Sequence, residues 1–298
     1  MAERRDSPCR GVANRKMPGR NEKQISMSDK RILFISEEIA PYVPGRELAD
    51  FSRKLAENAH SQKYEVRTFM PKYGTVNERR NQLHEVIRLS GANIPIGDND
   101  HPLIIKVASL QPFRIQVYFI DNEDYFQKLD DDEDPIGSNR ADNDERAIFF
   151  ARGTMETVKK LRWVPKVIFC TGWFAALTPI YLRSMYADDP SFKGAKIVYC
   201  VTPSRATGGI DAAILDKMQK EGMPKKKLEP FRSLPADTDM LHRMAIACAD
   251  AVVVADPAMS DDLRSFIAER KLPTLEFTVG DNVSAVFDFY KSLIPDEK

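Results

Sequence analysis

Short runs rich in β-branched residues alternate with longer segments of helical periodicity after Met27, and this alternation constrains the fold more than any other feature. Such an order is typical of a parallel sheet with helices on both faces. We therefore predict an α/β fold. The expected strands are Arg31–Ser36, Glu65–Met70, His84–Leu89, Leu103–Leu110, Arg114–Ile120, Lys166–Thr171, Lys196–Val201 and Ala251–Ala255.

Two of the intervening segments have clear helical spacing of apolar residues. These are 47–59 and 143–161, and the second follows Asp142, a residue type that favours a helix N-cap. Both are expected to be crossover helices. Only three residues separate the strands 103–110 and 114–120, so this pair is predicted to form an antiparallel hairpin within an otherwise parallel sheet.

The charge balance excludes partners that bind through a global electric field. Lys and Arg together number 44, as do Asp and Glu, so the formal net charge is zero. Neither nucleic acid nor an anionic membrane is therefore expected as a partner. No run approaches the roughly 20 apolar residues that span a bilayer, and the start of the chain lacks the apolar core of a secretory signal. We expect a cytoplasmic protein.

The cysteines and histidines do not have the spacing of a metal site. Three of the four cysteines lie in apolar runs, and no pair has the spacing of a zinc or redox motif. We expect reduced thiols, no metal and no cofactor. The cysteines are Cys9, Cys170, Cys200 and Cys248.

Residues 1–29 differ in composition from the rest of the chain. They are polar and basic and would bury little apolar surface. We interpret them as a disordered tail or as a misassigned start, with Met27 as the natural first residue. Residues 30–298 are then expected to form a single domain.

Three motifs near the start occur in a fixed order: Ser-Glu-Glu-Ile-Ala-Pro-Tyr at 36–42, Leu-Ala-Asp at 48–50 and Met-Pro-Lys-Tyr-Gly at 70–74. This order resembles the opening of the bacterial glycogen synthases and plant starch synthases. The segments 142–150 and 249–256 resemble two further parts of that family's framework. The resemblance covers about residues 30 to 270, and the length is similar to that of a short, single-domain form in the Bacteroidetes group.

The resemblance implies a Rossmann-like domain like the N-terminal half of a GT-B glycosyltransferase. It also implies transfer of glucose from ADP-glucose to an α-1,4-glucan. In complete enzymes of the family a second domain holds the nucleotide diphosphate. The resemblance reaches only the first domain, so we expect activity to be impaired or to depend on a separate chain that supplies the second.

Several functional positions of the family are altered in this sequence. Residues 44–47 replace the family's Lys-Thr-Gly-Gly, which removes its nucleotide-sugar lysine. Aligned on Trp173, its three histidines fall on Phe169, Thr171 and Phe174, and its aspartate falls on Gly172. No imidazole is therefore available to contact a sugar at these positions. The catalytic residues stay unassigned. Arg46 could meet a phosphate, but pairing with Glu38 or Glu47 is favoured.

Six matching residues lie near the expected carboxyl ends of strands, where open α/β sheets bind ligands. We predict that they line a glucan-binding cleft, with Tyr73 or Trp173 as a stacking surface. Each also has a structural interpretation, such as N-cap for Asp142, core for Trp173 and helix surface for Asp50. The six are Glu37, Asp50, Tyr73, Asp142, Asn143 and Trp173.

Three functional hypotheses follow. The chain is a glucosyltransferase that needs a partner, a non-catalytic glucan-binding or regulatory module, or a protein-interaction scaffold. The last hypothesis predicts a buried apolar cleft floor made by Phe169, Phe174 and Pro44.

Overall fold

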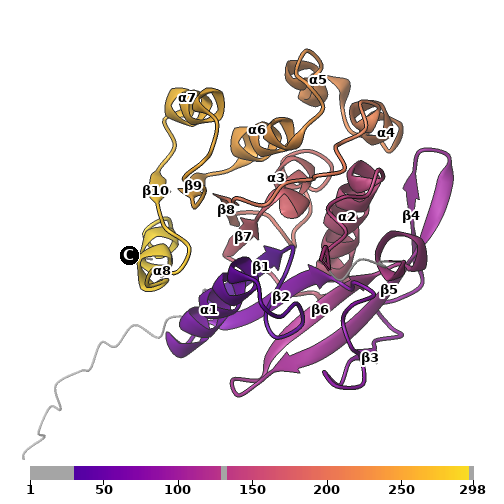
Figure 1. Cartoon of the computed structure of the whole chain (residues 1–298), viewed down its shortest axis with the longest axis vertical. Helices are drawn as coiled ribbons and strands as arrows, with labels where there is room; N and C mark the ends of the chain where they lie inside the picture. Colours follow the sequence, from indigo (N-terminus) through magenta and orange to yellow (C-terminus); the bar gives the residue numbers. More distant parts are fainter. Residues whose placement is uncertain (1–29, 129–132, 295–298) are drawn as a thin grey trace, which may run out of the picture.

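A mixed sheet organises the chain, and seven of its strands run parallel (Figure 1). The computed structural model describes residues 30–128 and 133–294, so the predicted N-terminal tail lies outside the described residues. The strand order is β10-β9-β8-β7-β1-β2-β6-β5-β3, and β4 pairs with β5. The parallel strands are β1 (Arg31–Ser36), β2 (Glu65–Pro71), β6 (Ile115–Asp121), β7 (Val167–Thr171), β8 (Lys196–Val201), β9 (Ala251–Val254) and β10 (Thr274–Glu276).

The central strands are almost continuously apolar because both of their faces are covered. Every residue of β7 and of β9 is buried, as is all of β1 after Arg31. Strands covered on both faces lose the alternation of polar and apolar residues that marks a half-exposed sheet. The predicted parallel α/β architecture is confirmed by this arrangement.

The antiparallel part of the sheet is only partly as predicted. β5 (Asn99–Leu110) pairs antiparallel with β6, which confirms the hairpin. The predicted strand 84–89 is wrong, because β3 consists of His84–Glu85 alone. The chain turns at Val86, whose carbonyl oxygen accepts from Leu89 N, and Ile87 is left 83% exposed. β4 (Ala92–Ile96), which also pairs with β5, was not predicted.

Helices cover both faces of the sheet (Figure 1). α1 and α8 contact each other on one face, while α2, α3 and α6 follow one another on the opposite face. Their bounds are α1 Glu47–Ser61, α2 Asn143–Leu161, α3 Leu177–Leu182, α4 Ile214–Lys220, α5 Lys225–Leu228, α6 Thr238–Cys248, α7 Asp261–Arg270 and α8 Ser284–Lys291. Short turns of other helix types are η2 Glu123–Gln127, η3 Trp173–Ala175 and η4 Glu229–Phe231.

The start of α2 differs from expectation in one detail. Asp142 stands at the N-cap, but its side chain accepts no hydrogen bond from the helix. Its carboxylate instead pairs with Arg140, at 2.5 Å from Nη2. The predicted capping role of this side chain is therefore wrong, and an ion pair takes its place.

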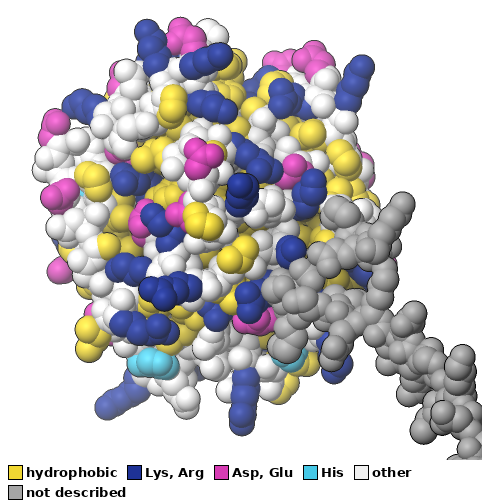
Figure 2. Space-filling view, turned by 180° about the vertical axis from the view of Figure 1, so that it is seen from behind, with side chains coloured by type: hydrophobic (Ala, Val, Ile, Leu, Met, Phe, Trp, Pro, Cys, Tyr) yellow, Lys and Arg dark blue, Asp and Glu magenta, His cyan; other side chains and the backbone are white. Residues whose placement is uncertain are grey.

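The surface agrees with a chain of zero net charge. On the face in Figure 2, hydrophobic side chains occur in small patches separated by charged and polar groups. No helix in the described part of the chain is long and apolar enough to cross a membrane. Cys170, Cys200 and Cys248 are free thiols, and the first two are buried.

Candidate functional site

The strand order changes direction at β1, which makes this point the natural ligand-binding position of the sheet. From β1 the chain proceeds outward through β2 and β6 on one side, and later through β7, β8 and β9 on the other. At such a switch point the loops that leave the carboxyl ends of neighbouring strands separate, so a crevice can form. Here Glu37 follows β1, Gly172 follows β7 and Thr202 follows β8.

Glu37 and Gly172 fit closely against each other across the switch point. Gly172 has φ 81° and ψ 172°, a conformation that essentially only glycine adopts. A Cβ atom at this position would lie 2.5 Å from Glu37 Oε1. The Glu37 carboxyl group thus occupies the space that a side chain at 172 would need. The aspartate that the resemblance places at 172 cannot coexist with this conformation of Glu37.

Two adjacent carboxyl groups, those of Glu37 and Glu38, are enclosed at this point. They are 1% and 0% exposed, and one oxygen of each has no hydrogen-bond partner in the described structure. Burial, together with the neighbouring Glu38, raises the pKa of Glu37 to about 8. Ser204 donates to Glu37 Oε2 at 3.0 Å, which opposes this rise only in part. Glu37 is therefore mainly protonated at neutral pH.

Arginine side chains cover the acidic pair from two loops. Arg46, just before α1, donates from Nε to Glu38 Oε2, as the favoured interpretation of this residue predicted. Burial still raises the pKa of Glu38, although Arg46 lowers it. Arg205, after β8, pairs with the buried carboxylate of Asp256 and donates to the Thr202 carbonyl oxygen at 2.8 Å. The two arginines are about one third exposed, so the site is closed by side chains that reach solvent.

A buried tyrosine and a buried histidine stabilise the turn at Gly172. The Tyr199 hydroxyl donates to the Gly172 carbonyl oxygen at 3.2 Å and lies 2.6 Å from His242 Nδ1. Burial lowers the pKa of His242 to about 4, so its ring is neutral at physiological pH. Its Nε2 has no partner in the described structure. The side chains of Tyr199 and His242 therefore fix the backbone at Gly172, and both are polar and uncharged.

Three of the six predicted residues lie together at this site. The Tyr73 hydroxyl donates to the Glu37 carbonyl oxygen at 2.8 Å, and both Tyr73 and Trp173 pack against the ring of Phe174. Tyr73 and Trp173 are both 0% exposed. Neither ring therefore presents a face to solvent on which a sugar could stack. Trp173 Nε1 is a further buried donor with no partner in the described structure.

The other three predicted residues are not part of this group of contacts. Asn143 is buried and its amide nitrogen donates to the carbonyl oxygens of Ser138 and Gly209, so it ties two loops together. Asp142 pairs with Arg140, and Asp50 is exposed on the first turn of α1. Their predicted role in binding a glucan stays a prediction.

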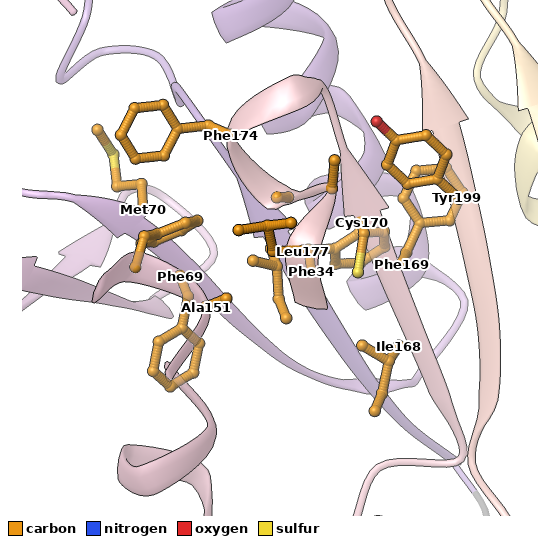
Figure 3. Close-up of a cluster of buried hydrophobic side chains, with 14 of the residues drawn as sticks. Phe34, Phe69, Met70, Ala151, Ile168, Phe169, Cys170, Phe174, Leu177 and Tyr199 are labelled. Carbon is orange, nitrogen blue, oxygen red and sulfur yellow. The ribbon is translucent and has the colours of Figure 1, made fainter. Parts of the chain in front are cut away.

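The apolar floor expected for a scaffold protein is only partly as predicted. Phe169 packs against Phe34 and against Tyr290 of α8, within the core (Figure 3). Phe174 lies on the turn after β7, with its ring among other buried aromatic rings. Pro44 is exposed. Phe169 and Phe174 are thus buried as expected, whereas Pro44 is not part of a buried floor, and the scaffold role stays a prediction.

Several residues of this site were not predicted. Glu38, Ser204 and Arg205 follow strand ends, and the rule that pointed to Glu37 could have found them. Tyr199 and His242 carried no sequence signal, because each looks like an ordinary core residue until the fold joins them. The described residues contain no group of His, Cys, Asp or Glu that could hold a metal ion.

A Rossmann-like sheet with buried carboxyl groups at its switch point is the arrangement of a ligand-binding α/β domain, and comparison with known proteins gives the class. Residues 31–274 match the starch synthase catalytic domain family. The chain belongs to this family of glycosyltransferases.

Glycogen synthases of Chlorobium and Chlorobaculum species are similar to this chain. The protein from Chlorobium luteolum is 35% identical over 66% of this chain and 40% of its own length. The proteins from Chlorobium phaeovibrioides and Chlorobaculum parvum are 30% and 34% identical over 80% and 79% of this chain. These two matches cover 48% and 47% of the relatives' own lengths. The chain thus spans about half the length of the curated relatives it matches.

The fold is also that of a solved synthase. The catalytic domain of starch synthase IV from Arabidopsis thaliana, bound to ADP and acarbose, superposes with a TM-score of 0.67 at 17% identity. The match covers 86% of this chain and 52% of that one. The described fold therefore resembles one half of a GT-B glycosyltransferase, as predicted.

Proposed function

We propose that this domain serves the transfer of glucose from ADP-glucose to an α-1,4-glucan and contributes the glucan-binding half of the site. Membership of the starch synthase catalytic domain family over residues 31–274 is the observation that supports it most. Asp50, exposed on the first turn of α1, supplies carboxylate oxygens that can accept hydrogen bonds from sugar hydroxyls.

We further propose that the domain does not transfer glucose by itself. Transfer requires charge stabilisation of the leaving diphosphate and alignment of the acceptor hydroxyl. Phe169, Thr171 and Phe174 supply no imidazole, and all three are at most 1% exposed. The two arginines at the switch point, Arg46 and Arg205, are engaged by Glu38 and Asp256. A partner chain that brings the missing cationic groups would complete the site.

A second function, glucan binding without transfer, is favoured by one specific observation. Arg46 and Arg205 are paired with the buried carboxyl groups of Glu38 and Asp256, so neither is free to bind a diphosphate, whereas Asp50 is exposed and can accept from sugar hydroxyls. In this case the domain acts as a glucan-binding or regulatory module in α-glucan metabolism.

One experiment separates these functions. The full chain is incubated with labelled ADP-glucose and glycogen, alone and with the isolated C-terminal half of a Chlorobium glycogen synthase, and glycogen co-sedimentation is measured in the same tubes. Transfer only in the mixture supports the first proposal. Co-sedimentation without transfer in either tube supports the binding module, and transfer by the chain alone overturns the proposed dependence on a partner. Absence of both signals would contradict both functions.

A variant pair shows whether any co-sedimentation uses the carboxyl edge of the sheet. Asp50→Asn alters an exposed acceptor on α1 near the switch point, and we expect weaker glycogen binding. Asp262→Asn alters an equally exposed carboxylate on the first turn of α7 and serves as the matched control. Equal binding by both variants would place the glucan elsewhere.

A further inference from the structure

A cavity of about 610 Å³ lies away from the switch point, between α1, β3 and the turn that joins β5 to β6. The elements that form it lie in the lower part of Figure 1. Its volume is in the range of small-molecule sites. Its lining residues include two arginines, Arg53 and Arg80, and no carboxylate.

The arginines of this cavity have unused donors. Arg53 donates from Nε to Glu57 at 2.7 Å and from Nη2 to the Gln111 carbonyl oxygen at 3.0 Å, and its Nη1 has no partner among the residues that the structure describes. The Arg80 guanidinium has no hydrogen-bond or ion-pair partner among residues 30–128 and 133–294. A planar guanidinium with free donors matches the oxygens of a phosphate group. The cavity therefore favours an anion over a neutral ligand.

The remaining lining groups suit hydroxyls rather than a second anion. Asn81, Gln82, Ser109 and Gln111 present amides or a hydroxyl, and Tyr42 contributes its ring and hydroxyl from the loop after β1. Tyr42 is 4% exposed and packs on Phe119, so its position is fixed. Phosphate alone would fill only a small part of 610 Å³. The rest has room for a sugar ring bonded to these donors and acceptors.

We propose that this cavity binds a sugar phosphate, with the phosphate held by Arg53 and Arg80 and the sugar hydroxyls facing the amide and hydroxyl groups. The site is separate from the switch point, so it does not depend on the proposed transferase function. A metabolite that carries both a hexose and a phosphate could then regulate or localise the domain without entering the transfer site.

The test is a calorimetric titration of the full chain with glucose 1-phosphate, inorganic phosphate and glucose. We expect glucose 1-phosphate to bind more tightly than inorganic phosphate, and glucose to bind at least tenfold more weakly than the ester. Raising the salt concentration should weaken binding of the ester, since it screens the arginine–phosphate attraction. Equal affinity for glucose and its phosphate would overturn the proposal, as would absence of heat with both phosphates.

Variants locate the binding. Arg80→Ala and Arg53→Ala should each weaken binding of glucose 1-phosphate at least tenfold. Arg79→Ala is the matched control, because Arg79 is an exposed neighbour that does not line the cavity, and it should bind as the unaltered chain does. Thermal unfolding of each variant shows that it is folded. Unchanged binding by both lining variants, or an equal loss in the control, would place the phosphate elsewhere and contradict the proposal.

Discussion

The switch point and the polar cavity beside α1 both contain charged residues, but they hold them in opposite ways. At the switch point the carboxyl groups of Glu37 and Glu38 are enclosed and covered by arginines. In the cavity the arginines face open space, and the guanidinium of Arg80 has no partner in the described structure. Charges that are buried and covered mainly affect stability, whereas charges facing a cavity can be removed at little structural cost. Substitutions in the two regions should therefore have different consequences.

The largest effect is expected from the protonation of Glu37. Its pKa is raised from 4.5 to about 8 by burial, so the folded protein holds a proton that the unfolded chain releases. The contribution of Glu37 to stability is fully present below pH 4.5, the pKa in the unfolded chain, and is lost as the pH rises to about 8, the pKa in the folded protein. Between pH 4.5 and about pH 8, the free energy of unfolding of the wild-type protein should fall relative to that of Glu37→Gln by at most about 1.4 kcal/mol per pH unit.

The measurement is urea unfolding of both proteins between pH 5 and pH 9. The difference between them isolates Glu37 from other groups, notably His242, whose pKa is lowered to about 4 and whose contribution is lost as pH falls below 6.5. The stability difference should change in favour of the glutamine variant up to about pH 8 and then level off. A constant difference across this range would show that Glu37 is ionised in the folded protein.

Gly172→Ala should have the next largest effect. The new Cβ would lie 2.5 Å from Glu37 Oε1, and the backbone has φ 81°. Strain and overpacking together predict a loss of about 3 kcal/mol. Gly194→Ala is the control, because Gly194 has φ 83° with no atom near the added Cβ, and it should show strain alone.

A double-mutant cycle with Glu37→Ala checks the cause. If the clash contributes, the loss from Gly172→Ala should be smaller by about 1 kcal/mol once the glutamate is shortened. Strict additivity of the two substitutions would show that the backbone conformation alone accounts for the loss.

The framework was more predictable than the site. Buried parallel strands such as β1 and β7 can be recognised in the sequence as apolar runs. The helices α1 and α2 can be recognised by the helical spacing of their apolar residues. β3 was overpredicted because 84–89 has strand composition, whereas a local turn at Val86 overrides it. β4 contains Pro95, a residue type that is unusual inside strands, so it was missed although its buried residues alternate.

The site was less accessible to sequence reasoning for a physical reason. Family motifs and strand ends located Glu37, Tyr73 and Trp173, but sequence does not tell whether an aromatic ring faces a cleft or the core. Both rings proved to be buried. The relation between Glu37 and Gly172 depends on the pairing of β1 with β7, whose partners Ser36 and Thr171 are 135 residues apart, and only the assembled sheet reveals it.

Arg46→Ala is expected to have a moderate effect. It removes the partner of Glu38, whose side chain is 1% exposed and whose other oxygen already lacks a partner in the described structure. Leaving this carboxyl group unpaired should lower the free energy of unfolding by about 2 kcal/mol at neutral pH. Protonation of Glu38 should reduce the loss at low pH.

The double variant Arg46→Ala with Glu38→Gln measures the origin of this loss. The amide carries no charge to bury, so the double variant should recover most of the stability, as followed by thermal unfolding at pH 7. A loss of equal size in the double variant would mean that packing of the arginine stem, not its charge, stabilises the loop.

Arg53→Ala should have the smallest effect on folding. Its pair with Glu57 lies on one turn of α1, with the two side chains 29% and 23% exposed. Exposed pairs of this kind contribute about 0.3–0.5 kcal/mol. Urea unfolding should therefore distinguish the two arginines near α1, with Arg53→Ala costing well under 1 kcal/mol. If Arg53→Ala lowered the free energy of unfolding as much as Arg46→Ala does, the contrast between the cavity and the switch point would be wrong, because the arginine of the cavity would also stabilise the fold.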